Sequence, residues 1–150
     1  MGSEMCIRDS KTSALHLNIS SLAKHFDELN TLLSLLQHNF SFIGISETRF
    51  LKDQEPVLDF SIPGYSHVST PTESSAGGVI LYISNTHAFK PRPDLSSSLY
   101  SSILLESVFV EIVNPKKRVP EMPIKLKLCC KRDNRVLSSS KCLASEEILR

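Results

Sequence analysis

The chain has 150 residues, of which 41% are hydrophobic and 22% are charged, a composition typical of one globular domain. No run of about 18 or more apolar residues is present, and the N-terminus lacks the apolar stretch of a secretory signal. These features argue against a transmembrane or secreted protein. We therefore expect a soluble intracellular protein, nuclear or cytoplasmic, with no membrane partner.

The first ten residues, MGSEMCIRDS, show no apolar periodicity, no helix cap and no strand pattern. The string resembles the translation of a transposase adapter used in preparing sequencing libraries, read from a GTG start. We therefore interpret residues 1–10 as an adapter-like artefact that is not part of the natural fold, and we expect the natural upstream sequence to be missing.

The following segment predicts a strand, a helix and a second strand. The first strand is indicated by the apolar residues Ala14, Leu15, Leu17 and Ile19. Ser20 or Ser21 offers an N-cap. An amphipathic helix ending near residues 37–39 is predicted by apolar residues at intervals of four and three, namely Leu22, Phe26, Leu29, Leu33 and Leu36. The mostly apolar run 40–45 is typical of a strand covered on both faces. This order is that of a right-handed parallel crossover unit.

Turn signals divide the chain up to residue 113. Pro63–Gly64 predicts a turn, and the break at residues 76–78 precedes an apolar strand over 79–83. Residues 85–100 contain two prolines and a serine run, so we expect a loop there. Alternating apolar residues predict one more strand over 102–113.

The segment 114–150 differs in charge from the rest of the chain. Residues 1–113 hold 7 Lys and Arg against 12 Asp and Glu, a balance of −5, whereas residues 114–150 hold 10 against 4, a balance of +6. Such a change indicates a boundary, a tail or a join between unlike pieces. Three of the four cysteines lie here, and their positions fit no zinc spacing: Cys129, Cys130 and Cys142. We expect an unrelated basic tail, disordered or frameshifted.

Two polar residues, Asn18 and Glu47, each end a predicted buried strand. Open α/β sheets place their ligand sites at the carboxyl ends of strands, where this amide and carboxylate would converge. Mg²⁺ accepts such oxygen ligands while keeping several waters. Alternatively, Asn18 satisfies backbone groups where the strand becomes a helix, and Glu47 is an ordinary solvated carboxylate. The residues alone leave both interpretations open.

Six short motifs follow one another between residues 15 and 113. They are LNISSL at 17–22, the helix with Leu29 and Leu33, FIGISET at 42–48, IPGY at 62–65, GGVILYI at 77–83 and LESVFV at 105–110. In this order they resemble the N-terminal part of the endonuclease domain of non-LTR retrotransposon reverse transcriptases, within the endonuclease/exonuclease/phosphatase superfamily. The resemblance covers about two-thirds of the chain, and the spacing of 29 between Asn18 and Glu47 suits it.

The resemblance implies a four-layer α/β sandwich, of which this chain would hold the N-terminal part. It implies hydrolysis of DNA phosphodiesters with Mg²⁺ and no small-molecule cofactor. Glu47 would bind the metal, and Asn18 would position the metal, the phosphate or the attacking water, which makes both catalytic residues. Arg49 would contact DNA, or is a plain surface arginine. Gly77–Gly78 would let the backbone approach DNA, or forms a tight turn.

Three later motifs of the family are absent: Tyr-x-Pro, Asp-x-Asn and Ser-Asp-His. Asp133–Asn134 is not Asp-x-Asn. None of the five histidines matches the catalytic one, and we expect helix-surface or loop positions for most of them: His16, His25, His38, His67 and His87. We therefore predict that the chain as written does not cleave DNA. Two other interpretations stay open, namely a non-catalytic nucleic-acid-binding fragment acting through its basic tail, and a decayed or misassembled product without a selected function.

Overall fold

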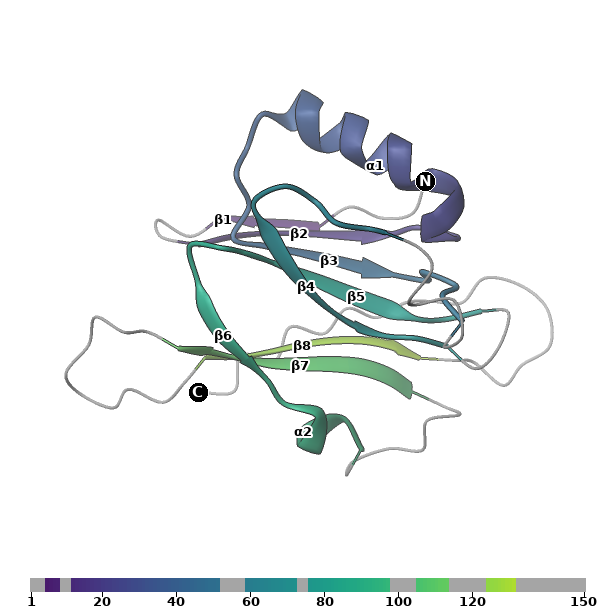
Figure 1. The fold of residues 1–150 in the computed structure, drawn as a ribbon, viewed down its shortest axis with the longest axis vertical. Coiled ribbons are helices and arrows are strands. Elements are labelled where there is room, and N and C mark those ends of the chain that lie inside the picture. The colour runs from purple at the N-terminus through teal and green to yellow at the C-terminus, as the bar shows by residue number, and fades with distance from the viewer. Residues whose placement is uncertain are drawn as a thin grey trace.

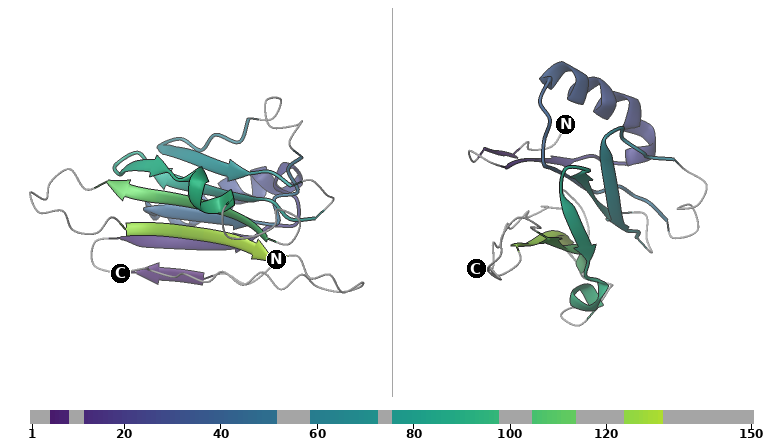
Figure 2. Two further views of the ribbon diagram at one scale, coloured as in Figure 1. Left: turned by 90° about the horizontal axis from the view of Figure 1, so that it is seen from below. Right: turned by 60° about the vertical axis from the view of Figure 1, so that its left-hand side comes forward.

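The fold has two β-sheets that lie face to face. The computed structural model describes residues 5–8, 12–51, 59–72, 76–97, 105–113 and 124–131. Helix α1 (Leu22–Leu36) covers the outer face of the first sheet, and the short α2 (Pro93–Ser97) lies beside the second (Figure 1). Figure 2 shows the second sheet and α1 on opposite sides of the first. This layered α/β arrangement agrees with the partial sandwich that the family resemblance implied.

The first sheet has the strand order β1-β2-β3-β5-β4, and the second has the order β6-β7-β8. The strand bounds are β1 Met5–Arg8, β2 Ser13–Asn18, β3 Phe42–Ser46, β4 Tyr65–Thr70, β5 Val79–Ser84, β6 Ala88–Pro91, β7 Leu105–Val113 and β8 Ile124–Lys131. Strands β2 and β3 pair in parallel across the α1 crossover, and the other strand pairs are antiparallel. The predicted order of strand, helix and parallel strand is therefore confirmed.

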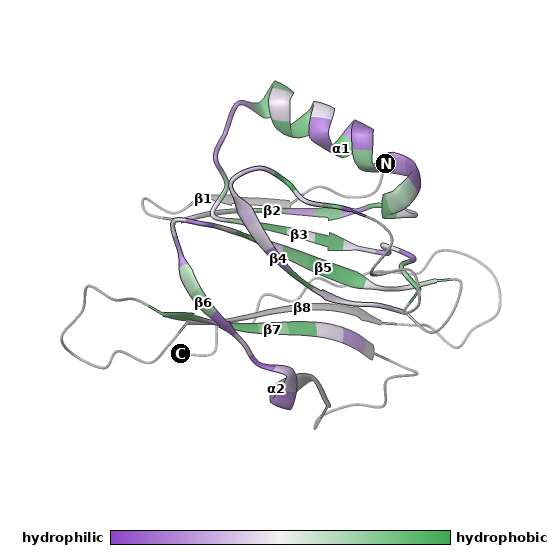
Figure 3. Ribbon diagram, in the orientation of Figure 1, coloured by the Kyte–Doolittle hydropathy of each residue, from purple (hydrophilic) through white to green (hydrophobic). Residues whose placement is uncertain are grey.

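The central strands of the first sheet are buried on both faces. In β5, Val79, Leu81 and Ile83 pack against β7 of the second sheet, whereas Ile80 and Tyr82 face α1. Strand β3 divides its side chains in the same way. Figure 3 shows the apolar residues concentrated on β3, β5 and β7. Because successive side chains of a strand point to opposite faces, a continuous apolar run is what such a covered strand requires.

The start of α1 is held by backbone groups and not by a side-chain cap. Ser21 precedes the helix, as predicted, but its φ is 81° and its side chain makes no capping bond. Instead, the N–H groups of Ser21 and Leu22 donate to the carbonyls of Glu47 and Thr48, at 3.0 and 2.9 Å. These bonds satisfy amides that a helix start leaves without intrahelical partners. They also tie the helix to the chain that follows β3.

The structure has helices or strands in three segments where the sequence predicted none. Residues 1–10 contain strand β1, which pairs with β2. The expected loop 85–100 contains β6 and α2. The expected disordered tail contains the eight residues of β8, which pair with β7. In each sheet the partner strand supplies the hydrogen bonds that define the element, and short-range patterns do not encode that partner. Residues 114–123 and 132–150 lie outside the described part of the chain.

The two helices are too short and too polar to cross a bilayer, so within the described ranges no element of this kind spans a membrane.

Replacing Leu29 in α1 with alanine should destabilise the chain by about 2–5 kcal/mol, because its 2% exposed side chain fills the core between α1 and the first sheet. The matched control is Leu35→Ala in the same helix, where the side chain is 75% exposed and the expected change is within about 0.5 kcal/mol. Urea unfolding followed by circular dichroism measures both. Equal losses would show that α1 does not pack as described.

Candidate functional site

The carboxyl ends of β2 and β3 lie side by side, on the right in Figure 1. The register pairs Asn18 with Ser46, the residue before Glu47. The structure thus brings Asn18 and Glu47 to the same edge of the first sheet. Asn18 is partly exposed and Glu47 is only 5% exposed. The alternative that Glu47 is an ordinary solvated carboxylate is therefore wrong.

Glu47 is fixed in position by both its backbone and its side chain. Its Oε2 accepts a hydrogen bond of 3.1 Å from the N–H of Gly77, and its carbonyl accepts the N–H of Ser21. Its φ of 59° lies in the left-handed region, which costs a non-glycine residue about 1–3 kcal/mol. The neighbouring bonds hold it there, and residues held in this way are concentrated at functional sites.

A second buried carboxylate, that of Glu106, reaches the same place from the second sheet. Its Oε2 accepts the N–H of Gly78, and its side chain is 4% exposed. Glu106 shares the inward face of β7 with Val108 and Val110, which pack against the first sheet. No pattern in the sequence had assigned Glu106 a role. Extending the alternation of β7 back by two residues would have revealed a charged residue at a core-facing position.

Gly77 and Gly78 connect these two carboxylates. Their φ values are 103° and 84°, and their consecutive N–H groups bind Glu47 and Glu106. A Cβ on Gly77 would overlap the Glu106 carboxylate, and one on Gly78 would overlap the Thr48 hydroxyl. The glycines are therefore required both for the turn and for the close approach of these side chains.

The two residues after Glu47 complete this edge. Thr48 is 2% exposed, and among the described residues its Oγ1 is a buried polar atom with no hydrogen-bond partner. Such atoms are rare because leaving one unsatisfied costs about 1–3 kcal/mol. Arg49 is exposed, has a φ of 54° and donates its backbone N–H to the Gly77 carbonyl at 2.8 Å.

The oxygen groups at this edge are the kind that a hard cation binds. The amide of Asn18 lies at the edge of the first sheet, and the carboxylates of Glu47 and Glu106 lie on adjacent glycine amides. Mg²⁺ is held in proteins by one or two carboxylates plus waters, so these residues fit it. In the described ranges no cluster of three or more His, Cys, Asp or Glu is present, which a magnesium site of this kind does not need.

The histidines lie apart from this carboxylate pair. His16 is in β2, where its Nε2 is 3.1 Å from the Ser46 hydroxyl, and burial lowers the pKa of its imidazole. Its place inside a strand departs from the expected surface or loop position. His67 is exposed but also lies in a strand, β4, and so departs from the expectation too. The other three follow it: His25 lies on α1 beside Glu28, and His38 and His87 are in connections.

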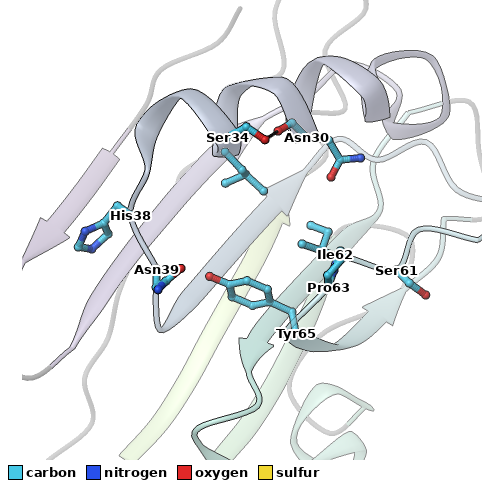
Figure 4. Close-up of a pocket in the computed structure, with 9 residues that line it drawn as sticks. Asn30, Ser34, His38, Asn39, Ser61, Ile62, Pro63 and Tyr65 are labelled. Carbon is cyan, nitrogen blue, oxygen red and sulfur yellow. Dashed lines mark hydrogen bonds between the residues drawn. The ribbon is translucent and has the colours of Figure 1, made fainter.

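A surface pocket of about 500 Å³ lies at the opposite edge of the first sheet (Figure 4). It is lined by Asn30, Leu33, Ser34, His38, Asn39, Ser61, Ile62, Pro63 and Tyr65. Asn39 precedes β3 and Tyr65 begins β4, so the pocket is next to the starts of these strands. It is therefore separate from the Glu47 edge.

The two-sheet α/β sandwich is the class of fold that the described elements define. It is similar to the crystal structure of the AP endonuclease LMAP from Leishmania major, with a TM-score of 0.51 and 12% sequence identity. The match covers 79% of this chain and 39% of that one. No family model matches the sequence, and no curated protein sequence matches it either. The similarity to LMAP therefore shows the fold.

Gly78→Ala should be more destabilising than Gly64→Ala, although both glycines have a φ of 84°. In each variant, holding alanine in a left-handed conformation should lower the free energy of unfolding by about 1–2 kcal/mol. At Gly64 no atom lies within 4 Å of the new Cβ, whereas at Gly78 it meets the Thr48 hydroxyl. Overpacking should add about 1–3 kcal/mol there. Chemical denaturation of the two variants gives the comparison, and equal losses would contradict the geometry.

The stability of the chain should depend on His16 below about pH 6.5. Burial lowers the pKa of His16 in the folded chain, so between that value and 6.5 the unfolded chain binds more protons. The stabilising contribution is complete above pH 6.5 and is lost as the pH falls through this range. Urea midpoints from pH 7.5 to pH 5 should therefore fall more steeply for the wild type than for His16→Asn. Parallel pH profiles would show that His16 is not desolvated.

Proposed function

We propose that this chain is the N-terminal part of a Mg²⁺-dependent DNA endonuclease domain of the retrotransposon type, in which Glu47 and Asn18 form the front of the active site. The observation that carries the proposal is the position of Glu47, which is buried, has a left-handed backbone and is bound to Gly77 at the edge where β2 and β3 end. The ordered motifs between residues 15 and 113 and the likeness to an AP endonuclease fold support it.

Each residue has a distinct part in this proposal. When bound, Mg²⁺ would stabilise negative charge on the phosphoryl and leaving oxygens during in-line attack by water. Glu47 would hold the cation through its carboxylate, and the bond from Gly77 keeps that carboxylate from rotating. Asn18, on the neighbouring strand end, would orient the phosphate or the water through its amide. Exposed Arg49 at the same edge would contact a DNA phosphate.

We also propose that this chain by itself does not cleave DNA. No Asp-x-Asn and no Ser-Asp-His occurs in its 150 residues. In the resembling family these motifs supply the groups that act on the nucleophile and the scissile phosphate. General acid–base catalysis contributes about 10²- to 10⁴-fold to a rate, and catalytic groups that act as a unit fail together when one is lost. A domain with only Asn18 and Glu47 would bind DNA weakly without hydrolysing it.

A supercoiled-plasmid nicking assay in Mg²⁺ tests this. The wild-type chain and Glu47→Ala should give the same background, with and without EDTA, because the groups acting on the nucleophile are missing. A chimera that continues residue 113 into the later strands and motifs of a retrotransposon endonuclease should nick the plasmid, and Glu47→Ala in the chimera should abolish nicking. Nicking by the wild-type chain that EDTA and Glu47→Ala both remove would contradict the inactivity. An active chimera unaffected by Glu47→Ala would contradict the role of Glu47.

A further inference from the structure

We infer that Glu106 is a second carboxylate ligand for the divalent cation that Glu47 would hold, so that the metal site is shared between the two β-sheets. This inference rests on the proposed function, because it concerns the same cation. It adds a residue to which neither the sequence motifs nor the fold comparison assigns a role.

The geometry at Gly77 and Gly78 brings the two carboxylates together. Consecutive N–H groups donate to Oε2 of Glu47 and to Oε2 of Glu106. Adjacent amides are only one peptide unit apart, so the two carboxylates converge on one short piece of backbone. Both are at least nine-tenths buried. A divalent cation held between two carboxylates would take oxygen ligands from both.

A third group at the same turn, the hydroxyl of Thr48, is an unsatisfied polar group. Thr48 Oγ1 is buried and has no hydrogen-bond partner within the described residues. It lies against Gly78, where it occupies the space that a Cβ would take. A hydroxyl can accept and donate, so a metal-bound water would satisfy it. The orphaned hydroxyl therefore lies at the same glycine turn that binds the two carboxylates.

The chemistry of these oxygen groups indicates which metal ion they would bind. A carboxylate offers about four acceptor positions, so a bond from one glycine amide is compatible with a metal bond from the same group. Oxygen ligands with no cysteine or histidine favour Mg²⁺ or Mn²⁺ over zinc. A site with two carboxylates and several waters is the usual form for Mg²⁺. The origin of the ligands, one from each sheet, means that the cation would also bridge the sandwich.

Isothermal titration with MgCl₂ and MnCl₂, together with thermal unfolding with and without each cation, tests the inference on the full chain. Glu106→Gln keeps an oxygen that can accept the Gly78 N–H but removes the charge. It should weaken cation binding by at least the roughly 10- to 100-fold that is lost when a residue supporting a metal ligand is changed, and it should remove the cation-dependent rise in Tm. The matched control is Glu111→Gln on the same strand, where the side chain faces away from the first sheet toward Arg92. It should bind the cation like the wild type.

The outcomes separate this inference from the proposed function. If Glu47→Gln loses the cation and Glu106→Gln binds it like the wild type, the shared site is wrong and the role of Glu47 stands. If the wild type binds neither cation, both proposals fail. If Glu106→Gln is unfolded without metal by circular dichroism, Glu106→Asp replaces it. Its shorter side chain should weaken binding in a folded chain, and wild-type affinity there would overturn the inference.

Discussion

Burial of β3 and β5 on both faces is the constraint on which the rest of this structure depends. Because α1 covers one face and β7 the other, neither strand has room for a polar side chain along most of its length. An ionised group in such a layer would have to be desolvated at a cost that only good partners offset. The polar chemistry is therefore displaced to the places where these strands begin and end.

The end of β3 shows how that displacement is achieved. After β3, the chain passes through Glu47 and Arg49, which both have left-handed backbone conformations. Backbone hydrogen bonds join this segment to the start of α1 and to the two glycines before β5. These bonds hold a backbone conformation that would otherwise be unfavourable by a few kcal/mol. As a result, Glu47 is buried and its carboxylate has one defined position. A metal ligand needs preorganisation of this kind.

The second sheet packs against the first sheet and also supplies a residue of the candidate site. Strand β7 presents valines along the inter-sheet core and then, at Glu106 near its start, a carboxylate on the same face. That carboxylate meets the glycine turn that also holds Glu47. The packing of the two sheets therefore also brings the carboxylates of Glu47 and Glu106 together. A change that separated the sheets would also separate the two carboxylates.

The sequence by itself determined the local elements and half of the site. The spacing of Leu22, Leu29 and their neighbours predicted α1, the apolar run 40–45 predicted the covered strand β3, and the crossover order predicted that Asn18 and Glu47 end at one edge. These features follow from periodicity, which is written in neighbouring residues. Only the tertiary structure decided that Met5–Arg8 and Ile124–Lys131 are strands, and that Glu106 reaches Gly78 from the other sheet. The reason is that strand edges and inter-sheet contacts join residues far apart in the chain, and no short-range pattern specifies such a partner.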